Sequence, residues 1–315
     1  MKKRLQQLGP LTGLLAVFAL FAVLRPQVFP TGDNIQLMLL QTAVVGTAAL
    51  GMTVVIISGG IDLSVGSVVA LSTVVIALLM NAGAPPFVAA LGGVVVGSMC
   101  GAFIGALVTR LRLASFIVTL AMWGALRGLT KGLANEQMVL APESWLNGLL
   151  NTLGEGERWM VVPPGVWLML VLAVLVGGFL HYTKMGRHVV AVGSNEQTAR
   201  LCGIPVEKTK LMVYVIGSSF AALAGVLQFS YLTVGDPTTG TGMELDVIAA
   251  VVIGGASLSG GEGKVFGSLI GALIMTVVAN GSTKMELPNW VQEIVTGAII
   301  IIAVVLDRYR HRRGE

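Results

Sequence analysis

The residues of this sequence that could do chemistry are polar side chains set among long apolar stretches, and Asp62 is the most distinctive of them. A carboxylate beside or within an apolar layer is costly to keep there, so it is a candidate for contact with a solute. Its charge could instead cap a helix that starts near Ser64, where it would meet the positive end of the helix dipole. The sequence leaves both roles open.

A second group of polar residues recurs every four positions within the apolar stretch 113–130. Because four residues are close to one helical turn, these side chains would share one face of a helix. Hydroxyl groups and an aromatic ring suit a sugar, which needs hydrogen bonds at its hydroxyls and stacks its apolar face on rings. The alternative is a polar seam between helices, in which Arg127 reaches the outer interface. The group consists of Ser115, Thr119, Trp123 and Arg127, and Gln41, Gln228 and Asn280 are isolated candidates of the same kind.

The run 258–262, Leu-Ser-Gly-Gly-Glu, resembles the signature motif of the nucleotide-binding domain of cassette ATPases. Such a domain also needs a G-x-x-x-x-G-K-[ST] loop to hold phosphates. The one candidate, Gly263-Lys264, is followed by Val265, and the run lies between two apolar segments with no room for an ATPase fold. We therefore expect this chain to bind no ATP. The two cysteines and three histidines lack metal-site spacing, and no nucleophile–base pair predicts an enzyme.

The elements that must position these residues are long apolar segments. The chain is 55% hydrophobic and only 11% charged, whereas about a quarter of a soluble domain is charged. Segments of this length are able to cross a bilayer, so we predict an all-α polytopic membrane protein with about ten transmembrane helices in one domain, 1–315. The predicted spans are 8–24, 35–57, 64–80, 86–109, 113–130, 164–181, 210–231, 244–256, 264–280 and 289–306.

The basic residues orient these spans. Most of the 20 Lys and Arg residues lie at one set of span ends, which the positive-inside rule assigns to the cytoplasm. Both termini are then cytoplasmic, and 131–163 is the longest extracytoplasmic loop, with a short surface helix expected at 144–153. The basic residues at span ends need no nucleic-acid partner. The N-terminal run resembles a signal peptide, but Arg25-Pro26 follows it in place of a cleavage site, so we expect it to be retained.

The polar run 182–210 is the largest predicted cytoplasmic segment. Residues 196–204 within it predict a short helix, which Ser194 or Asn195 can cap. Glu196 suits its first turn, and Gly203 followed by Pro205 would end it. A short capped helix held between two membrane spans is suited to docking a soluble partner.

Glycines mark two further features of the apolar segments. In 86–109 they recur at four-residue spacing, which lets another helix approach closely and favours helix packing over a ligand role. The runs 54–64 and 251–259 are also weakly similar, since both are apolar and broken by Gly-Gly, a pattern found in transporters with interrupted helices. The packing glycines are Gly93, Gly97, Gly101 and Gly105.

Three stretches together resemble a known family. They are 51–67, which contains Gly59-Gly60-Ile61-Asp62-Leu63-Ser64, then 191–204, and then 244–267. In order and over nearly the whole chain, they are similar to the permease subunit of bacterial ribose-type sugar importers of the ATP-binding cassette (ABC) class.

This resemblance implies the ABC-importer permease fold and a multi-pass protein of the bacterial inner membrane, surrounded by membrane lipid. It implies a dimer with a second permease copy or a paralogue, and cassette ATPase subunits that bind ATP and Mg²⁺ below it. A periplasmic sugar-binding protein would deliver a monosaccharide or a sugar-like solute from above. The segment 195–204 matches the coupling helix that takes the ATPase stroke, although Thr198-Ala199 and Cys202 replace the usual Ala-Ala pair and Ser. The residues expected to couple are Ser194, Asn195, Glu196, Ala199, Arg200, Gly203 and Ile204.

Two alternatives stay open. An ion-coupled secondary transporter needs acids or histidines within the membrane, and only Asp62, Glu244 and Asp246 are available. A permease of the same ABC class for a nucleoside or a branched-chain amino acid would share the general plan.

Overall fold

The computed structural model describes residues 9–312, apart from the side chains of 155, 157, 158 and 306–312. The basic residues Lys2, Lys3, Arg4 and Arg313, which contribute to the predicted orientation, lie outside this range. The helices are α2 (Gly9–Leu24), α3 (Gly32–Ile57), α4 (Val65–Asn81), α5 (Pro86–Arg110), α6 (Ser115–Leu133), α7 (Pro164–Tyr182), α8 (Lys184–Ser194), α9 (Glu196–Leu201), α10 (Val206–Leu232), α11 (Met243–Ile253), α12 (Val265–Lys284) and α13 (Asn289–Arg312).

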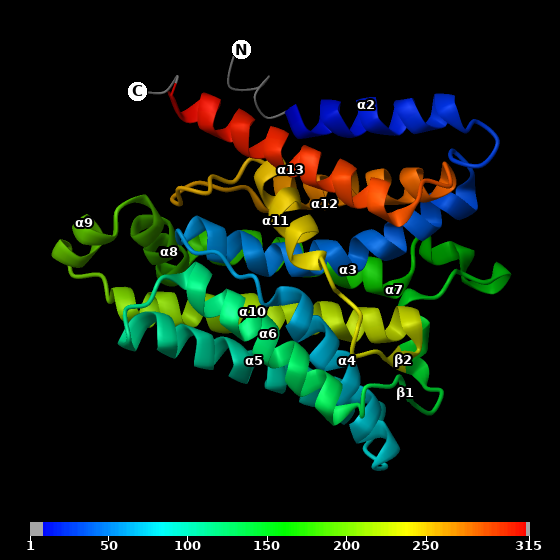
Figure 1. Cartoon of the computed structure of the whole chain (residues 1–315), viewed down its shortest axis with the longest axis horizontal. Helices are drawn as coiled ribbons and strands as arrows, with labels where there is room; N and C mark the ends of the chain where they lie inside the picture. The colour runs from blue at the N-terminus through cyan, green and yellow to red at the C-terminus, as the bar shows by residue number, and fades with distance from the viewer. Residues whose placement is uncertain (1–8, 313–315) are drawn as a thin grey trace.

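The chain is a bundle of apolar helices, and each predicted span overlaps one of them (Figure 1). Within the described residues, five helices are long and apolar enough to cross a membrane, namely α3, α5, α7, α10 and α12. The predicted span 244–256 ends earlier, because α11 stops at Ile253 after 11 residues. At 1.5 Å per residue it is about 16 Å long, roughly half the thickness of a bilayer core.

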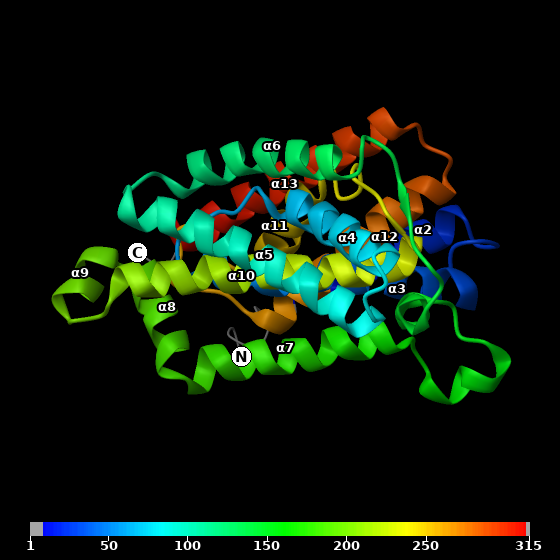
Figure 2. The ribbon, with the colours of Figure 1, turned by 90° about the horizontal axis from the view of Figure 1, so that it is seen from below.

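Helix α3 is the most buried of the long helices, and α10 packs against it and against α4 and α5 (Figures 1 and 2). The four-residue glycine series of α5 faces these neighbours. A Cβ atom added at Gly101 would lie 2.8 Å from Ser218 Cβ, and one added at Gly105 would lie 3.0 Å from Leu211 Cα. Gly97 faces Ala222, and Gly93 faces Ser72 of α4. Without side chains at these positions, the α5 backbone lies directly on α10.

Helices α3 and α11 end in a glycine cap, of a kind that α4 also has at Gly83. At the end of α3, Gly59 has a φ of +79° and donates its N–H to Ile56 O, while Gly60 donates to Val55 O. At the end of α11, Gly255 has a φ of +94° and makes the equivalent bond to Val252 O. Both are Schellman motifs, which satisfy the last carbonyls of a helix. The similar runs 54–64 and 251–259 therefore encode one shared backbone conformation.

The extracytoplasmic loop predicted at 131–163 is tied to the bundle. Strand β1 (Val139–Leu140) pairs antiparallel with β2 (Val234–Gly235), which follows α10. The helix expected at 144–153 is a shorter 3₁₀ helix, η1 (Trp145–Leu150), capped by Ser144. It does more than lie on the surface, because Leu146 and Leu150 are buried. A second 3₁₀ helix, η2 (Glu155–Met160), precedes α7.

We predict that Gly101→Leu disrupts the α5–α10 contact, because the new side chain would overlap Ser218. Overpacking of this kind costs about 1–3 kcal/mol. The expected result is a lower midpoint of thermal unfolding in detergent, followed by fluorescence-detected size exclusion. Gly124→Leu is the matched control, since open space surrounds Gly124 on α6. Equal midpoints for the two variants would contradict the packing role.

Candidate functional site

The polar segment between α7 and α10 contains two helices, of which the sequence analysis predicted one. Helix α8 begins at Thr183, whose hydroxyl accepts a hydrogen bond from the Gly186 N–H at 3.0 Å. Helix α9 begins at Asn195, whose side chain accepts from the Thr198 N–H at 2.8 Å. Asn195 is therefore the cap, while Ser194 is the last residue of α8. The threonine cap at 183 is the signal that could have revealed α8.

The end of α9 is fixed by Gly203, which has a φ of +80°. Gly203 donates its N–H to Arg200 O at 3.1 Å, and Ile204 donates to Ala199 O at 3.0 Å, so this end is also a Schellman motif. No atom lies within 4 Å of a Cβ built at Gly203. The demand for glycine here comes from the backbone conformation and not from lack of space.

The side chains of α9 divide into inward and outward groups. Ala199 and Ile204 pack inward, in a small cluster with Val192 of α8 and Val206 of α10. Leu201 points outward and is 88% exposed, the largest value among the exposed large hydrophobic side chains. Gln197 beside it is exposed as well. The outward face is the part of α9 that a partner could touch, and the sequence analysis did not select either residue.

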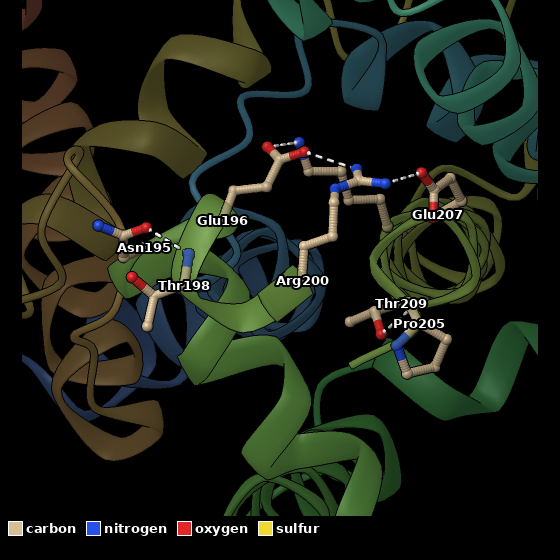
Figure 3. A network of polar contacts seen from close by, with 8 residues as sticks. Asn195, Glu196, Thr198, Arg200, Pro205, Glu207 and Thr209 are labelled. Atoms are coloured by element: carbon tan, nitrogen blue, oxygen red, sulfur yellow. Dashed lines mark hydrogen bonds and ion pairs between the residues drawn. The ribbon is translucent and has the colours of Figure 1, made fainter. Parts of the chain in front are cut away.

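Charged side chains join α9 to the first turns of α10 (Figure 3). Arg200 pairs with Glu207 at 2.6 Å, and it also reaches Glu196 at 3.5 Å. Lys210 pairs with the other oxygen of Glu196 at 2.5 Å. The hydrogen bond that Arg200 donates to Glu207 raises the pKa of Arg200, so the guanidinium stays charged. Exposed ion pairs contribute little to stability, so their main effect is to fix the direction of α9 relative to α10.

The docking segment, 183–205, also contacts the end of α3. A Cβ atom at Gly193 of α8 would lie 2.7 Å from Gly261 N and would overlap the Ile57 carbonyl. Gly261 itself donates its N–H to Ile57 O at 2.8 Å. The end of α8, the end of α3 and the loop before α12 therefore meet at one point. A cavity of about 280 Å³ lies nearby, between the α9–α10 ion pairs, the Gly59–Gly60 turn and Tyr214.

Asp62 is 1% exposed and lies just before α4. One carboxylate oxygen accepts from both the N–H and the hydroxyl of Ser64, at 2.8 and 2.6 Å. The other oxygen, Oδ2, has no hydrogen-bond partner within the described residues. Ser64 is the N-cap residue of α4. Asp62 therefore stabilises the non-helical turn before α4 by bonding Ser64, and it does not bond the first turn of the helix itself.

The polar face of α6 lies along two non-helical segments, 58–64 and 233–242. Thr119 donates to Ile61 O at 3.2 Å, and Ser115 Oγ accepts from the Ile61 N–H at 3.5 Å. Further along, Ser67 donates to the main-chain carbonyl of Trp123 at 2.8 Å.

Arg127 corrects one alternative of the sequence analysis, which placed its side chain at the outer interface. It is buried, at 8% exposed, and donates to the carbonyls of Pro237 and Thr239 at 2.9 and 2.7 Å. These two carbonyls lie outside any helix, and the buried guanidinium supplies their hydrogen-bond donors. Gln228 belongs to the same region, since its Nε2 donates to Thr239 Oγ1 at 3.0 Å.

Asn280, the remaining candidate, lies elsewhere. It is buried on α12 and lines a separate cavity with Gln41 of α3 and Asp246 of α11. Within the described residues, no group of three His, Cys, Asp or Glu side chains is arranged to hold a metal ion.

Residues 34–304, from the start of α3 into α13, match the family described as the branched-chain amino acid transport system permease component. The chain belongs to this family. The match includes the docking segment, the glycine caps of α3 and α11 and the polar cavity of Asn280. Together with its apolar helices, the match makes this permease a multi-pass protein of the bacterial inner membrane.

Named relatives are similar over almost their full length. The permease is 39% identical to the ribose import permease protein of Escherichia coli (strain K12), over 97% of this chain and 95% of the relative. It is 38% identical to the ribose import permease protein of Bacillus subtilis (strain 168), over 96% and 93%. It is 37% identical to the L-arabinose ABC transporter permease protein of Azospirillum brasilense, over 96% and 88%. No solved structure matches the permease.

We predict that Arg200→Glu frees α9 from α10, because it places a third carboxylate beside Glu196 and Glu207. A spin label on the exposed Cys202, with Cys100 replaced by Ser, should become more mobile by electron paramagnetic resonance. Adding Glu207→Arg should restore the original mobility. The midpoint of thermal unfolding should change little, since the pairs are exposed.

Lys208→Glu is the control, because Lys208 is exposed in the first turn of α10 and forms no ion pair among the described residues. A label equally mobile in Arg200→Glu and Lys208→Glu would show that the ion pairs do not hold α9.

Proposed function

We propose that this chain is the membrane-spanning subunit of an ABC importer, and that it moves a monosaccharide into the cytoplasm using ATP hydrolysed by a partner. The observation that carries the proposal is the near full-length similarity to ribose import and L-arabinose permeases. The helix α9 supports it, because it is capped at both ends, anchored inward and exposes Leu201 outward.

In the arrangement that we propose, about ten helices cross the membrane, and both termini and the docking segment are cytoplasmic. The basic residues at the docking end of the bundle support this orientation. Two copies of the chain, or this chain and a paralogue, would form the pathway. Cassette ATPases holding ATP and Mg²⁺ would bind at α9, and a periplasmic sugar-binding protein would bind at the opposite end, where β1 and β2 lie (Figure 1).

The contacts of α9 provide a mechanism for coupling. Closure of the ATPases would push on the outward face of α9, around Leu201. The caps at Asn195 and Gly203 keep α9 intact under this load. The Arg200–Glu207 pair would pass the motion to α10, and α8 would pass it to the end of α3 and the loop before α12. Since α10 packs on α3, α4 and α5, a shift of α10 biases the bundle between outward-open and inward-open states.

The family description raises one competing solute, since it refers to branched-chain amino acids. The named relatives favour a sugar, and they match this chain over nearly its whole length. Uptake assays should therefore compare D-ribose and L-arabinose with L-leucine.

We predict that Gly203→Val abolishes uptake without affecting membrane insertion. A β-branched residue is strained at a φ of +80°, so the end of α9 would change while the buried bundle stays intact. Uptake of labelled sugar by cells containing the complete importer should fall at least about tenfold, at equal permease levels on immunoblots. Gly203→Asn is the control and should keep most of the activity, because asparagine tolerates this conformation.

A second prediction concerns the energy source. Proteoliposomes containing the permease alone should not accumulate D-ribose or L-arabinose, with or without a proton gradient. Liposomes that also hold the ATPase and the binding protein should accumulate one of them when ATP is present on the ATPase side. Accumulation by the permease alone would contradict the proposed function and favour an ion-coupled carrier.

A further inference from the structure

A cavity of about 280 Å³ lies between α3, α11 and α12, away from the docking segment. Its volume is at the lower end of the range for ligand pockets, which suits one sugar ring better than an oligosaccharide. It is lined by four apolar side chains and six polar ones. The apolar residues are Leu37, Val45, Met275 and Ala279, and the polar residues are Gln41, Asp246, Thr276, Asn280, Thr283 and Lys284.

The cavity lies in the half of the bundle opposite to α9. The Gly261–Ile57 hydrogen bond places the C-terminal end of α3 and the loop before α12 at the docking end. The cavity is instead lined by the N-terminal half of α3 and the C-terminal half of α12. A solute arriving from the side away from the ATPases would therefore reach it first.

Four of the polar side chains have unused hydrogen-bonding capacity. Gln41, Asp246, Asn280 and Lys284 make no hydrogen bond or ion pair within the part of the chain that the structure describes. Asn280 is 5% exposed, and its Oδ1 atom is buried without a partner. Buried polar atoms are normally paired, so the unpaired Asn280 Oδ1 beside a cavity indicates that a further group binds there. Gln41, Asp246 and Lys284 are partly exposed, and their free polar groups are available to the same occupant.

The two threonine hydroxyls that line the cavity, unlike the four side chains above, already donate hydrogen bonds. Thr276 donates to Ala272 O at 3.0 Å, and Thr283 donates to Ala279 O at 2.9 Å. Their donors are used within α12, as is usual for threonine in a helix. The unpaired groups therefore mark out a subset of the lining, drawn from all three helices.

We propose that this cavity holds the solute in transit and that Gln41, Asp246 and Asn280 bind its hydroxyl groups. The proposal rests on the proposed function and specifies where the sugar is recognised within the permease. Each sugar hydroxyl both donates and accepts, and the two carboxamides do the same. The Asp246 carboxylate accepts and the Lys284 ammonium donates, so opposite charges on the lining suit a neutral solute. Leu37 and Met275 offer apolar contact to the carbon face of the ring.

The test uses the complete importer, with its ATPase and binding protein, in proteoliposomes. Asn280→Leu and Gln41→Leu remove the carboxamides at nearly constant size. We expect about tenfold less D-ribose or L-arabinose transported per ATP hydrolysed, while stimulation of ATP hydrolysis by the loaded binding protein stays within about twofold. Preserved stimulation shows that docking and coupling are intact, which a merely misfolded variant would not do.

Thr42→Val is the matched control. Thr42 neighbours Gln41 on α3 and is buried, but it does not line the cavity, and its hydroxyl donates to Met38 O. Its transport per ATP should equal that of the unmodified permease. If both cavity variants transport as much sugar per ATP as Thr42→Val, the proposal is overturned.

A labelling experiment covers the case in which a cavity variant does not assemble. With Cys100 and Cys202 replaced by Ser, Asn280→Cys should react with a methanethiosulfonate reagent, and excess transported sugar should protect it. Equal labelling with and without sugar would also overturn the proposal. Failure of the proposed function looks different, since the unmodified importer would then move neither sugar in the presence of ATP.

Discussion

Backbone groups that leave a helix inside an apolar bundle cannot turn to water, and this chain contains several such places. Between α3 and α4, glycine caps and the Asp62–Ser64 turn satisfy the freed groups. Between α10 and α11, the buried guanidinium of Arg127 binds two main-chain carbonyls. The polar face of α6 thus stabilises the irregular segments that border the half-length helix α11.

These irregular segments are also where distant parts of the chain meet. The capped end of α3 contacts α8 on one side and the loop before α12 on the other. Helix α9 is joined to α10 by ion pairs, and α10 packs closely against α5 because glycines of α5 face the backbone and small side chains of α10. A displacement of 183–205 can therefore reach α3 and the loop before α12 through the close backbone contacts of α8, and α10 through the ion pairs of α9. The softer contacts are the exposed ion pairs, which fix direction and contribute little stability.

Local patterns gave the sequence analysis its reliable results. Hydrophobic stretches located a helix for every predicted span, and the cap at Asn195 and the glycine at 203 located α9. These features depend on neighbours within a few residues, which the sequence displays directly. The missed helix α8 also had a local signal at Thr183, but its Gly186, polar composition and basic charge gave it the appearance of a loop.

Other features depend on residues far apart in the chain. Arg127 donates to carbonyls that lie 110 and 112 residues away in the chain. Its spacing from Thr119 therefore could not show whether its side chain reaches the outer interface or binds buried main-chain carbonyls. Three separate helices contribute Gln41, Asp246 and Asn280 to the cavity, and their packing brings these residues together. The sequence analysis placed Asn280 among the pathway candidates, yet it treated Asp246 as an acid near a span end. The environment of Asp246 depends on tertiary packing, which the periodicity of the sequence cannot predict.

The outward leucine of α9 has a consequence for how the membrane complex is built. Leu201 is almost fully exposed, on a helix whose other exposed residues are polar or charged. Burying such a side chain is worth about 1.5–3 kcal/mol, enough to make the assembled state preferred by one to two orders of magnitude from this residue alone. If the proposed ATPase covers Leu201, the unassembled subunit exposes an apolar side chain that the assembled one buries.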